Sequence, residues 1–271
     1  MNIPLLQSEH VGFSYEGHQA LTGMNFTIRE GEFVCLLGPS GCGKTTLLNL
    51  IAGFLFPTSG RLRFRGQPIT RPGPDRAVVF QNGALLDWLT VKDNITFSQI
   101  CRRMPQQARN VISRRMTALV GLSGFEDRYP YQLSGGMKQR VGVARALATE
   151  AQIILMDEPF SAVDVQTRES LQEELLRIHR KTRCTVVFVT HSIDEAVFLS
   201  DRIFLLSKPG EAPMEEFRID LPAPRWDENN RLHPSFLAVR EKIYLKMRRQ
   251  HAGDRAVVPQ GIGVGEAYAG S

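Results

Sequence analysis

The feature that most constrains the fold is a glycine-rich loop between an apolar strand and an apolar helix. Residues 38–45 read GPSGCGKT, with the apolar stretch Phe33–Leu37 before them and Lys44–Ala52, apolar at helical spacing, after them. In loops of this pattern, backbone amides surround phosphate groups, the lysine reaches the β- and γ-phosphates, and the Thr hydroxyl ligates Mg²⁺. The context favours a phosphate site over an incidental glycine turn. The predicted nucleotide contacts are Gly38, Pro39, Ser40, Gly41, Cys42, Gly43, Lys44, Thr45 and Thr46.

Strand-like and helix-like segments alternate around this loop. The chain starts β-rich, with Leu5–Tyr15 and Ala20–Ile28, and alternation resumes with strand Ile153–Met156 and runs to Leu206. Between them, residues 85–148 are polar and helical. With the phosphate loop, the pattern predicts an α/β fold of the P-loop NTPase type, with a mainly parallel core sheet, a β-rich N-terminal part and an inserted α-helical subdomain.

The domain boundaries follow from the same pattern. We expect one domain over residues 1–208, with the helical insertion at about 85–148, and a C-terminal extension over 209–250. The extension contains a predicted basic helix, Pro234–Arg249. The Gly-rich end, within 251–271, is predicted to be a flexible tail.

Two carboxylates follow the apolar strand Ile153–Met156. Asp157 and Glu158 stand at its carboxyl end, where ligands gather in open α/β sheets. By itself such a pair is as often a set of loop acids. After a phosphate loop, Asp157 is predicted to hold Mg²⁺ and Glu158 to orient and polarise the attacking water.

Two more polar residues follow apolar strands. Gln81 comes after Ala77–Phe80, and His191 comes after Thr185–Val189. Each could be only a polar residue leaving the sheet.

A second phosphate-binding pattern occupies Leu133–Arg140. Ser134 is a good helix N-cap, and Gly135 and Gly136 let backbone amides approach an anion closely. The N-terminus of a helix starting there would attract a phosphate. One nucleotide does not need two such cradles from one small domain. We therefore predict that this cradle closes over a nucleotide held by another copy of the chain.

Taken together, these segments resemble the ATP-binding subunit of an ABC transporter, whose signature motif reads LSGGQ. The resemblance covers roughly Leu5 to Ser207. It implies a P-loop NTPase fold of the ABC ATPase type, in which the N-terminal β subdomain is antiparallel. It implies catalytic roles for Glu158, for Gln81 as the Q-loop residue that also senses Mg²⁺, and for His191 as the switch histidine. It further implies that Asp164 reaches across a dimer and that Tyr15 stacks on adenine, which we favour over an ordinary strand aromatic at Tyr15.

Within that family the chain is similar to the nitrate/sulfonate/taurine importer group, and most closely to taurine-importer ATPases. Residues 49–54 (NLIAGF), 75–82 (DRAVVFQN) and 157–160 (DEPF) carry the similarity. Met137 departs from it, because glutamine is usual there. The resemblance implies an ATP-hydrolysing subunit, with ATP and Mg²⁺, that energises uptake of a small solute of the taurine, sulfonate or nitrate type.

The same resemblance implies partners and a location. These are a second ATPase subunit, identical or equivalent, a transmembrane permease and, indirectly, a solute-binding protein outside the membrane. The expected place is the cytoplasmic face of the inner membrane, since no apolar run reaches the roughly 20 residues of a membrane helix and no secretory signal is visible.

The net charge of +5 is compatible with an anionic partner, but the arginines are dispersed and few aromatics lie among them. We therefore expect no nucleic acid. The alternative is a soluble ABC-type ATPase of DNA repair or translation, but a long coiled coil or tandem ATPase domains are missing. Intact Lys44, Glu158 and His191 disfavour a non-catalytic scaffold, and the Leu133–Arg140 pattern has no role in a P-loop kinase.

Overall fold

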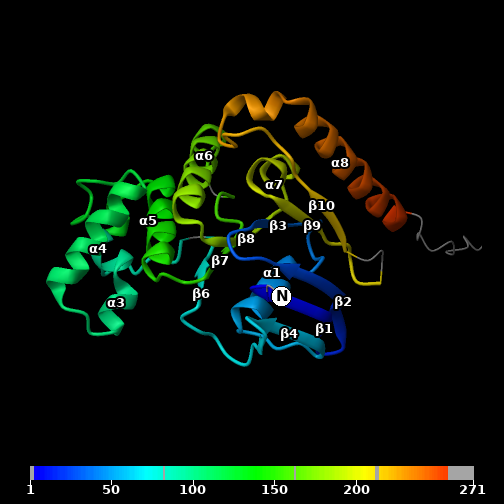
Figure 1. Cartoon of the computed structure of the whole chain (residues 1–271), viewed down its shortest axis with the longest axis horizontal. Helices are drawn as coiled ribbons and strands as arrows, with labels where there is room; N and C mark the ends of the chain where they lie inside the picture. The colour runs from blue at the N-terminus through cyan, green and yellow to red at the C-terminus, as the bar shows by residue number, and fades with distance from the viewer. Residues whose placement is uncertain (1–2, 82, 162, 211–213, 256–271) are drawn as a thin grey trace, which may run out of the picture.

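The architecture consists of two sheets with a helical insertion on one side (Figure 1). The computed structural model describes residues 3–81, 83–161, 163–210 and 214–255. The smaller sheet is antiparallel, in the order β2-β1-β4-β5. Its strands are β1 (Leu6–Tyr15), β2 (His18–Ile28), β4 (Ser59–Phe64) and β5 (Gln67–Pro68). This is the antiparallel N-terminal sheet that the sequence predicts.

The larger sheet carries the core of the fold, in the order β10-β9-β3-β8-β7-β6. The strands from β9 to β6 are parallel, and β10 is antiparallel at the edge. Both β3 and β8 are buried along their whole length, which explains their unbroken apolar sequences. The strands are β3 (Phe33–Leu37), β6 (Arg76–Val79), β7 (Ile153–Asp157), β8 (Thr185–Thr190), β9 (Arg202–Leu205) and β10 (Glu215–Arg218).

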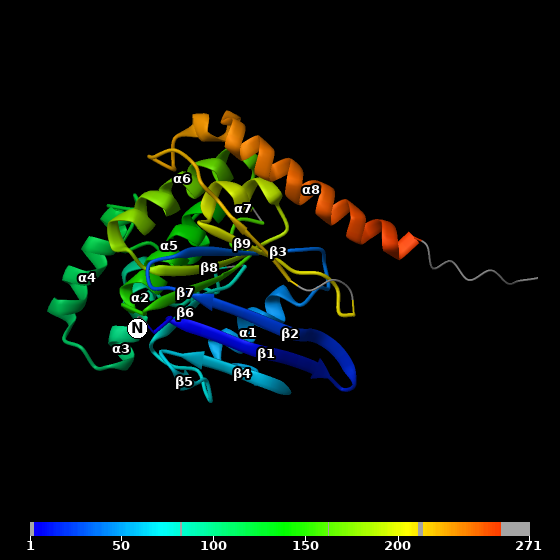
Figure 2. The ribbon, with the colours of Figure 1, turned by 45° about the vertical axis from the view of Figure 1, so that its right-hand side comes forward.

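Two apolar layers cover the two faces of this sheet. One layer includes α1 (Lys44–Ala52) and the inner face of the smaller sheet. The other includes α6 (Val165–Thr182), α7 (Ile193–Leu199) and α8 (Pro234–Arg255). Figure 2 shows the small sheet and α1 on one side of the larger sheet, and α6, α7 and α8 on the other. The parallel strands are therefore shielded from water on both faces.

The helical insertion has a small core of its own. It lies between β6 and β7 in the chain and packs on the rest through α5, which contacts β6 and α6. In Figure 1 these helices form the left-hand lobe. They are α2 (Val91–Ile95), α3 (Phe97–Cys101), α4 (Gln106–Leu119), a short 3₁₀ turn (Pro130–Gln132) and α5 (Gly135–Ala148).

The C-terminal extension differs from its sequence prediction in two places. It contributes strand β10, which the sequence analysis did not anticipate, and its helix α8 continues past Arg249 to Arg255. Of the β10 residues only Phe217 is buried, because the strand lies at the sheet edge. The remainder of the tail predicted to be flexible, 256–271, lies outside the described residues.

In the part of the chain that the structure describes, every helix is too short or too polar to cross a bilayer.

Candidate active site

The parallel register brings the predicted site residues to one edge of the larger sheet. Leu37 of β3 pairs with Thr190 of β8, Val189 pairs with Asp157 of β7, and Met156 pairs with Val79 of β6. Since these strands are neighbours and parallel, the segments that follow them emerge side by side. The glycine-rich loop, His191, Glu158 and Gln81 therefore share the carboxyl edge.

The glycine-rich loop fits tightly under its neighbours. A Cβ at Gly38 would lie 2.6 Å from the carbonyl oxygen of Leu206, and one at Gly43, where φ is 93°, would lie 2.6 Å from that of Ala20. Lys44 is only 7% exposed. Its Nζ donates to the carbonyl oxygens of Gly38 (2.8 Å) and Pro39 (2.9 Å). The chain itself therefore holds the loop and its cation in place.

The first turn of α1 offers free amides at the same place. Its N-cap residue, Gly43, provides no side chain to accept their hydrogen bonds. The amides and the positive end of the helix dipole favour an anion there. Because Lys44 lies within the same turn, the arrangement suits a phosphate group.

Thr45 and Asp157 provide a pair of oxygen ligands beside the loop. The Thr45 hydroxyl donates to Asp157 Oδ1 at 3.3 Å. Burial raises the pKa of the Asp157 carboxyl, the Glu158 charge adds to this, and the Thr45 bond and Lys44 oppose it. Within the described ranges, no three His, Cys, Asp or Glu side chains cluster as a metal cage. The two oxygen donors of Thr45 and Asp157 fit Mg²⁺, which takes few protein oxygens and completes its shell with phosphate and water.

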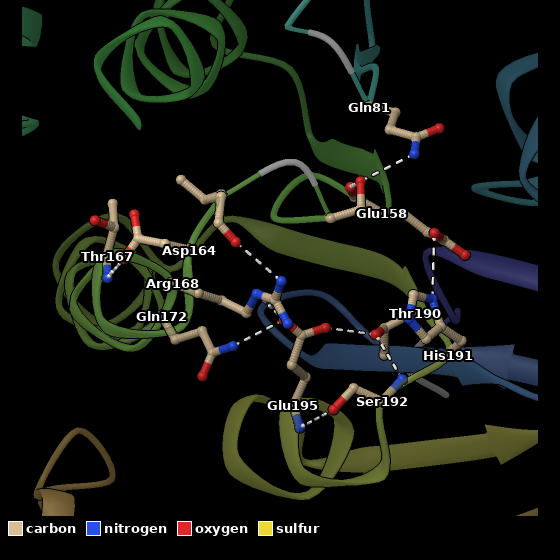
Figure 3. A network of polar contacts seen from close by, with 12 residues as sticks. Gln81, Glu158, Asp164, Thr167, Arg168, Gln172, Thr190, His191, Ser192 and Glu195 are labelled. Atoms are coloured by element: carbon tan, nitrogen blue, oxygen red, sulfur yellow. Dashed lines mark hydrogen bonds and ion pairs between the residues drawn. The ribbon is translucent and has the colours of Figure 1, made fainter. Parts of the chain in front are cut away.

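Glu158 and His191 form the second contact at the edge. His191 Nδ1 lies 3.3 Å from Glu158 Oε2 (Figure 3). The Glu158 backbone has a φ of 43°, in the left-handed region, and its amide donates to the Val189 carbonyl at 3.1 Å. A non-glycine residue held in this conformation costs about 1–3 kcal/mol, and such residues concentrate at functional sites.

Gln81 is tied to Glu158 through Ser161. Gln81 Nε2 donates to Ser161 Oγ at 2.9 Å, and that hydroxyl donates to the Glu158 carbonyl at 3.0 Å. Ser161 was not predicted as a site residue from the sequence. Its position three residues after Glu158, just past a strand end, was the available signal.

The other predicted residues make their contacts elsewhere. Ser134 is the N-cap of α5 and accepts from the Met137 amide at 3.3 Å. Asp164 is the N-cap of α6 and accepts from the Thr167 amide at 3.0 Å, a bond that lowers the pKa of Asp164. Tyr15 is half-exposed and packs edge-on against Phe13.

The N-terminus of α5 is open. Ser134 and Gly135 are exposed, and a Cβ added at Gly135 would meet nothing within 4 Å. The Met137 side chain instead turns to the core of the helical insertion. An anion could therefore reach the α5 amides from outside the chain.

The family model described as "ABC transporter" matches residues 21–161, more than half of the chain. The chain belongs to the ABC transporter family. The match includes the loop at 38–45, Gln81, the α5 N-terminus and Glu158. It identifies the chain as an ABC-type ATPase and an ATP-binding subunit.

Relatives of this ABC ATPase are also described as transport ATP-binding proteins. It is 50% identical over 85% of its length to an uncharacterized ABC transporter ATP-binding protein of Methanocaldococcus jannaschii, covering 86% of that protein. It is 44% identical to the bicarbonate transport ATP-binding protein CmpD of Synechococcus elongatus, over 88% of each chain. The related CmpC of the same organism is 48% identical over 85% of this chain, which spans 35% of CmpC.

Solved structures share the fold. The ATP-binding cassette MJ0796, in a dimeric post-hydrolysis state bound to ADP and Pi, is 31% identical with a TM-score of 0.67, covering 79% of this chain and 99% of that one. CbiO1 of Clostridium perfringens has a TM-score of 0.74 at 24% identity, covering 93% and 99%. The predicted P-loop fold of the ABC ATPase type is confirmed.

Proposed function

We propose that this ABC ATPase powers an importer for a small solute by hydrolysing ATP between two copies of the chain. The observation that carries the proposal is the combination of a closed phosphate loop around Lys44 and an open helix N-terminus at Ser134. The loop and its neighbours bind and orient one face of the nucleotide. The open cradle supplies the other face in a partner copy.

The loop holds the phosphates in this proposal. Amides of residues 38–46 and the Lys44 ammonium bind the β- and γ-phosphates, and Tyr15 stacks on the adenine. Thr45, Asp157 and Gln81 hold Mg²⁺, directly or through water. When bound, the ion neutralises charge on the phosphates.

Glu158 and His191 act at the γ-phosphate. The Glu158 carboxylate accepts a hydrogen bond from the attacking water and directs it in line with the bond that breaks. His191, 3.3 Å from that carboxylate, contacts the γ-phosphate. Gln81, linked to Glu158 through Ser161, relays the state of the site to the permease.

A head-to-tail dimer completes two such sites. Each nucleotide lies between the Lys44 loop of one copy and the Ser134–Gly136 amides of the other, with Asp164 near the interface. Asp164 caps α6 where that helix begins, and Gly136 packs against Thr167 of the same helix. Closure and reopening of the dimer then switch the permease between its inward-facing and outward-facing states.

The permease docks beside Gln81, at the cytoplasmic face of the inner membrane. Trp88 in the segment after Gln81 is 73% exposed, and Phe80 before it is also exposed. Exposed aromatics next to a nucleotide-sensing residue suit a protein interface. The bicarbonate transport relatives and the similarity to taurine, sulfonate and nitrate importers point to a small anionic or zwitterionic solute, with taurine as our first candidate.

The test joins purification to transport. Tagged wild-type protein is expected to co-purify with a polytopic membrane protein, and cells carrying it are expected to take up one solute of a panel of taurine, alkanesulfonates, nitrate and bicarbonate. Lys44→Ala should co-purify with the same permease and support no uptake. Co-purification with nucleic acid or ribosomes instead would favour a role in DNA repair or translation and reject the proposal.

A further inference from the structure

A buried carboxylate stands directly behind His191. Glu195 lies in the first turn of α7 and is only 9% exposed. Its Oε2 accepts from the Thr190 hydroxyl, and its Oε1 accepts from Gln172 Nε2 at 2.9 Å. A carboxylate is costly to bury unless it is hydrogen-bonded, and both of its oxygens are bonded here. The neighbouring side chains (Figure 3) therefore satisfy both oxygens of the buried Glu195 carboxylate.

Glu195 fixes the residues on both sides of His191. Because the Thr190 hydroxyl donates its proton to Glu195, its lone pairs are free to accept the Ser192 amide, at 3.0 Å. The Ser192 hydroxyl in turn accepts from the Glu195 amide at 3.3 Å. His191 is the one residue between these two anchors, so Glu195 fixes the backbone from which the His191 ring extends.

The same carboxylate is connected to the segment before α6. Arg168 Nε lies 4.0 Å from Glu195 Oε1, and Arg168 Nη2 donates to the Val163 carbonyl at 3.0 Å. Val163 immediately precedes Asp164, which we place at the dimer interface. The Glu195 charge therefore lies near the guanidinium that holds this backbone, although Arg168 Nε makes no hydrogen bond to it.

The C-terminal extension completes the network. Arg231 Nη2 donates to Gln172 Oε1 at 2.7 Å, and its guanidinium lies 3.9 Å from the centre of the Phe198 ring. With its oxygen bonded to Arg231, the Gln172 amide must present its nitrogen to Glu195. Arg231 of the extension thus orients the Gln172 amide, and this amide in turn orients Glu195.

We propose that Glu195 is a positioning residue that sets the His191 ring for ATP hydrolysis and links it to the Asp164 segment and the C-terminal extension. This inference rests on the function proposed above for His191. Glu195 touches neither nucleotide nor water in this account. It acts through Thr190, Ser192, Arg168 and Gln172.

The test uses Glu195→Gln in the full chain. The amide keeps the size of the side chain but cannot accept hydrogen bonds at both ends, and it loses the charge beside Arg168. We expect kcat for ATP hydrolysis to fall about tenfold. The affinity for ATP, measured by fluorescence titration, should stay within about twofold, because Lys44 and its loop are untouched.

A matched control lies next to it. Asp194 is the adjacent carboxylate of the same helical turn, but it faces outward and pairs with Arg240 at the surface. Asp194→Asn should keep wild-type kcat, since exposed ion pairs contribute about 0–1 kcal/mol. Thr190→Val, which removes only the hydroxyl partner, should reproduce the direction of the Glu195→Gln effect.

A spectroscopic readout separates positioning from general stability. The ¹³Cε1–¹H resonance of His191, assigned by its absence in His191→Ala, should move in Glu195→Gln and stay in place in Asp194→Asn. Wild-type kcat, or an unmoved resonance, in a folded Glu195→Gln protein would overturn the inference. If His191→Ala itself hydrolyses ATP at the wild-type rate, the function proposed for His191 fails instead.

Discussion

The phosphate loop and the N-terminus of α5 offer the same chemistry in opposite settings. At the loop, Lys44 is almost fully buried and its ammonium is held by two carbonyls of its own loop. At α5, Ser134 and Gly135 are exposed, and space is open beside Gly135. The phosphate loop is formed entirely by residues of one chain. The N-terminus of α5 is an open helix end that an anion can approach from outside the chain, and for this reason we propose that it binds a partner's nucleotide.

The largest loss of activity is expected from a substitution in the phosphate loop. Lys44→Ala removes the buried cation and leaves two loop carbonyls without their donor. ATP hydrolysis should fall on the order of a thousandfold, with ATP binding lost in parallel. Coupled-enzyme assays and titration with a fluorescent ATP analogue measure the two. Lys181→Ala, an exposed lysine near the end of α6, should behave as wild type; persistent binding in Lys44→Ala would break the contrast.

Ser134→Arg should separate binding from hydrolysis. A large cation at the open cradle blocks closure by the partner, so hydrolysis should fall about a hundredfold. The affinity of a single chain for ATP should change by less than about threefold, because the phosphate loop is intact. Equilibrium titration and steady-state rates on the same preparation decide this. A matching loss of affinity would mean that the cradle acts on its own chain's nucleotide.

Asp157→Asn, beside the phosphate loop, should lower the ATPase activity and raise the stability of the ligand-free chain. Burial raises the pKa of Asp157 above its ordinary value of 3.8, so the folded chain holds this proton more tightly than the unfolded chain. The carboxyl therefore favours folding at low pH, and that contribution is lost as pH rises through the folded-state pKa.

At neutral pH the ligand-free Asp157→Asn variant should melt about 1–3 °C above wild type, and the difference should shrink toward pH 4. Differential scanning calorimetry over a pH series gives the curve, and the exposed Asp87→Asn is the control. A variant that melts below wild type at pH 7 would show that the Thr45 bond outweighs the cost of burial.

The smallest effect is expected at Met137. Its side chain packs into the helical insertion while the backbone amides of the cradle remain available. Met137→Gln should change the hydrolysis rate by less than about threefold. A gain above tenfold in the same assay would show that a side chain at this position contacts the nucleotide.

Local sequence predicted one region better than the other. The strand–loop–helix unit and the two acids at the carboxyl end of β7 were predictable because each depends on residues adjacent in the chain, and parallel strands align such ends. Strand β10 was not, since one buried phenylalanine among charged residues has no periodicity to detect.

Ser161 and Glu195 were missed for a related reason. Their partners lie on other elements: Gln81 follows β6, and Gln172 belongs to α6. Only the sheet order β8-β7-β6 and the packing of α6 on α7 bring these groups together. In our proposal the α5 cradle meets a nucleotide held by a second chain, and the pattern of one chain does not specify its position relative to that nucleotide.

The central claim is that a second copy completes the site, and a trapped dimer tests it most directly. Glu158→Gln should bind ATP with Mg²⁺ and hydrolyse it very slowly, and sedimentation should give the mass of two chains. Glu158→Gln combined with Ser134→Arg should bind ATP equally well and sediment as one chain. Two chains in the double variant, or one ATP-loaded chain in Glu158→Gln, would contradict the account.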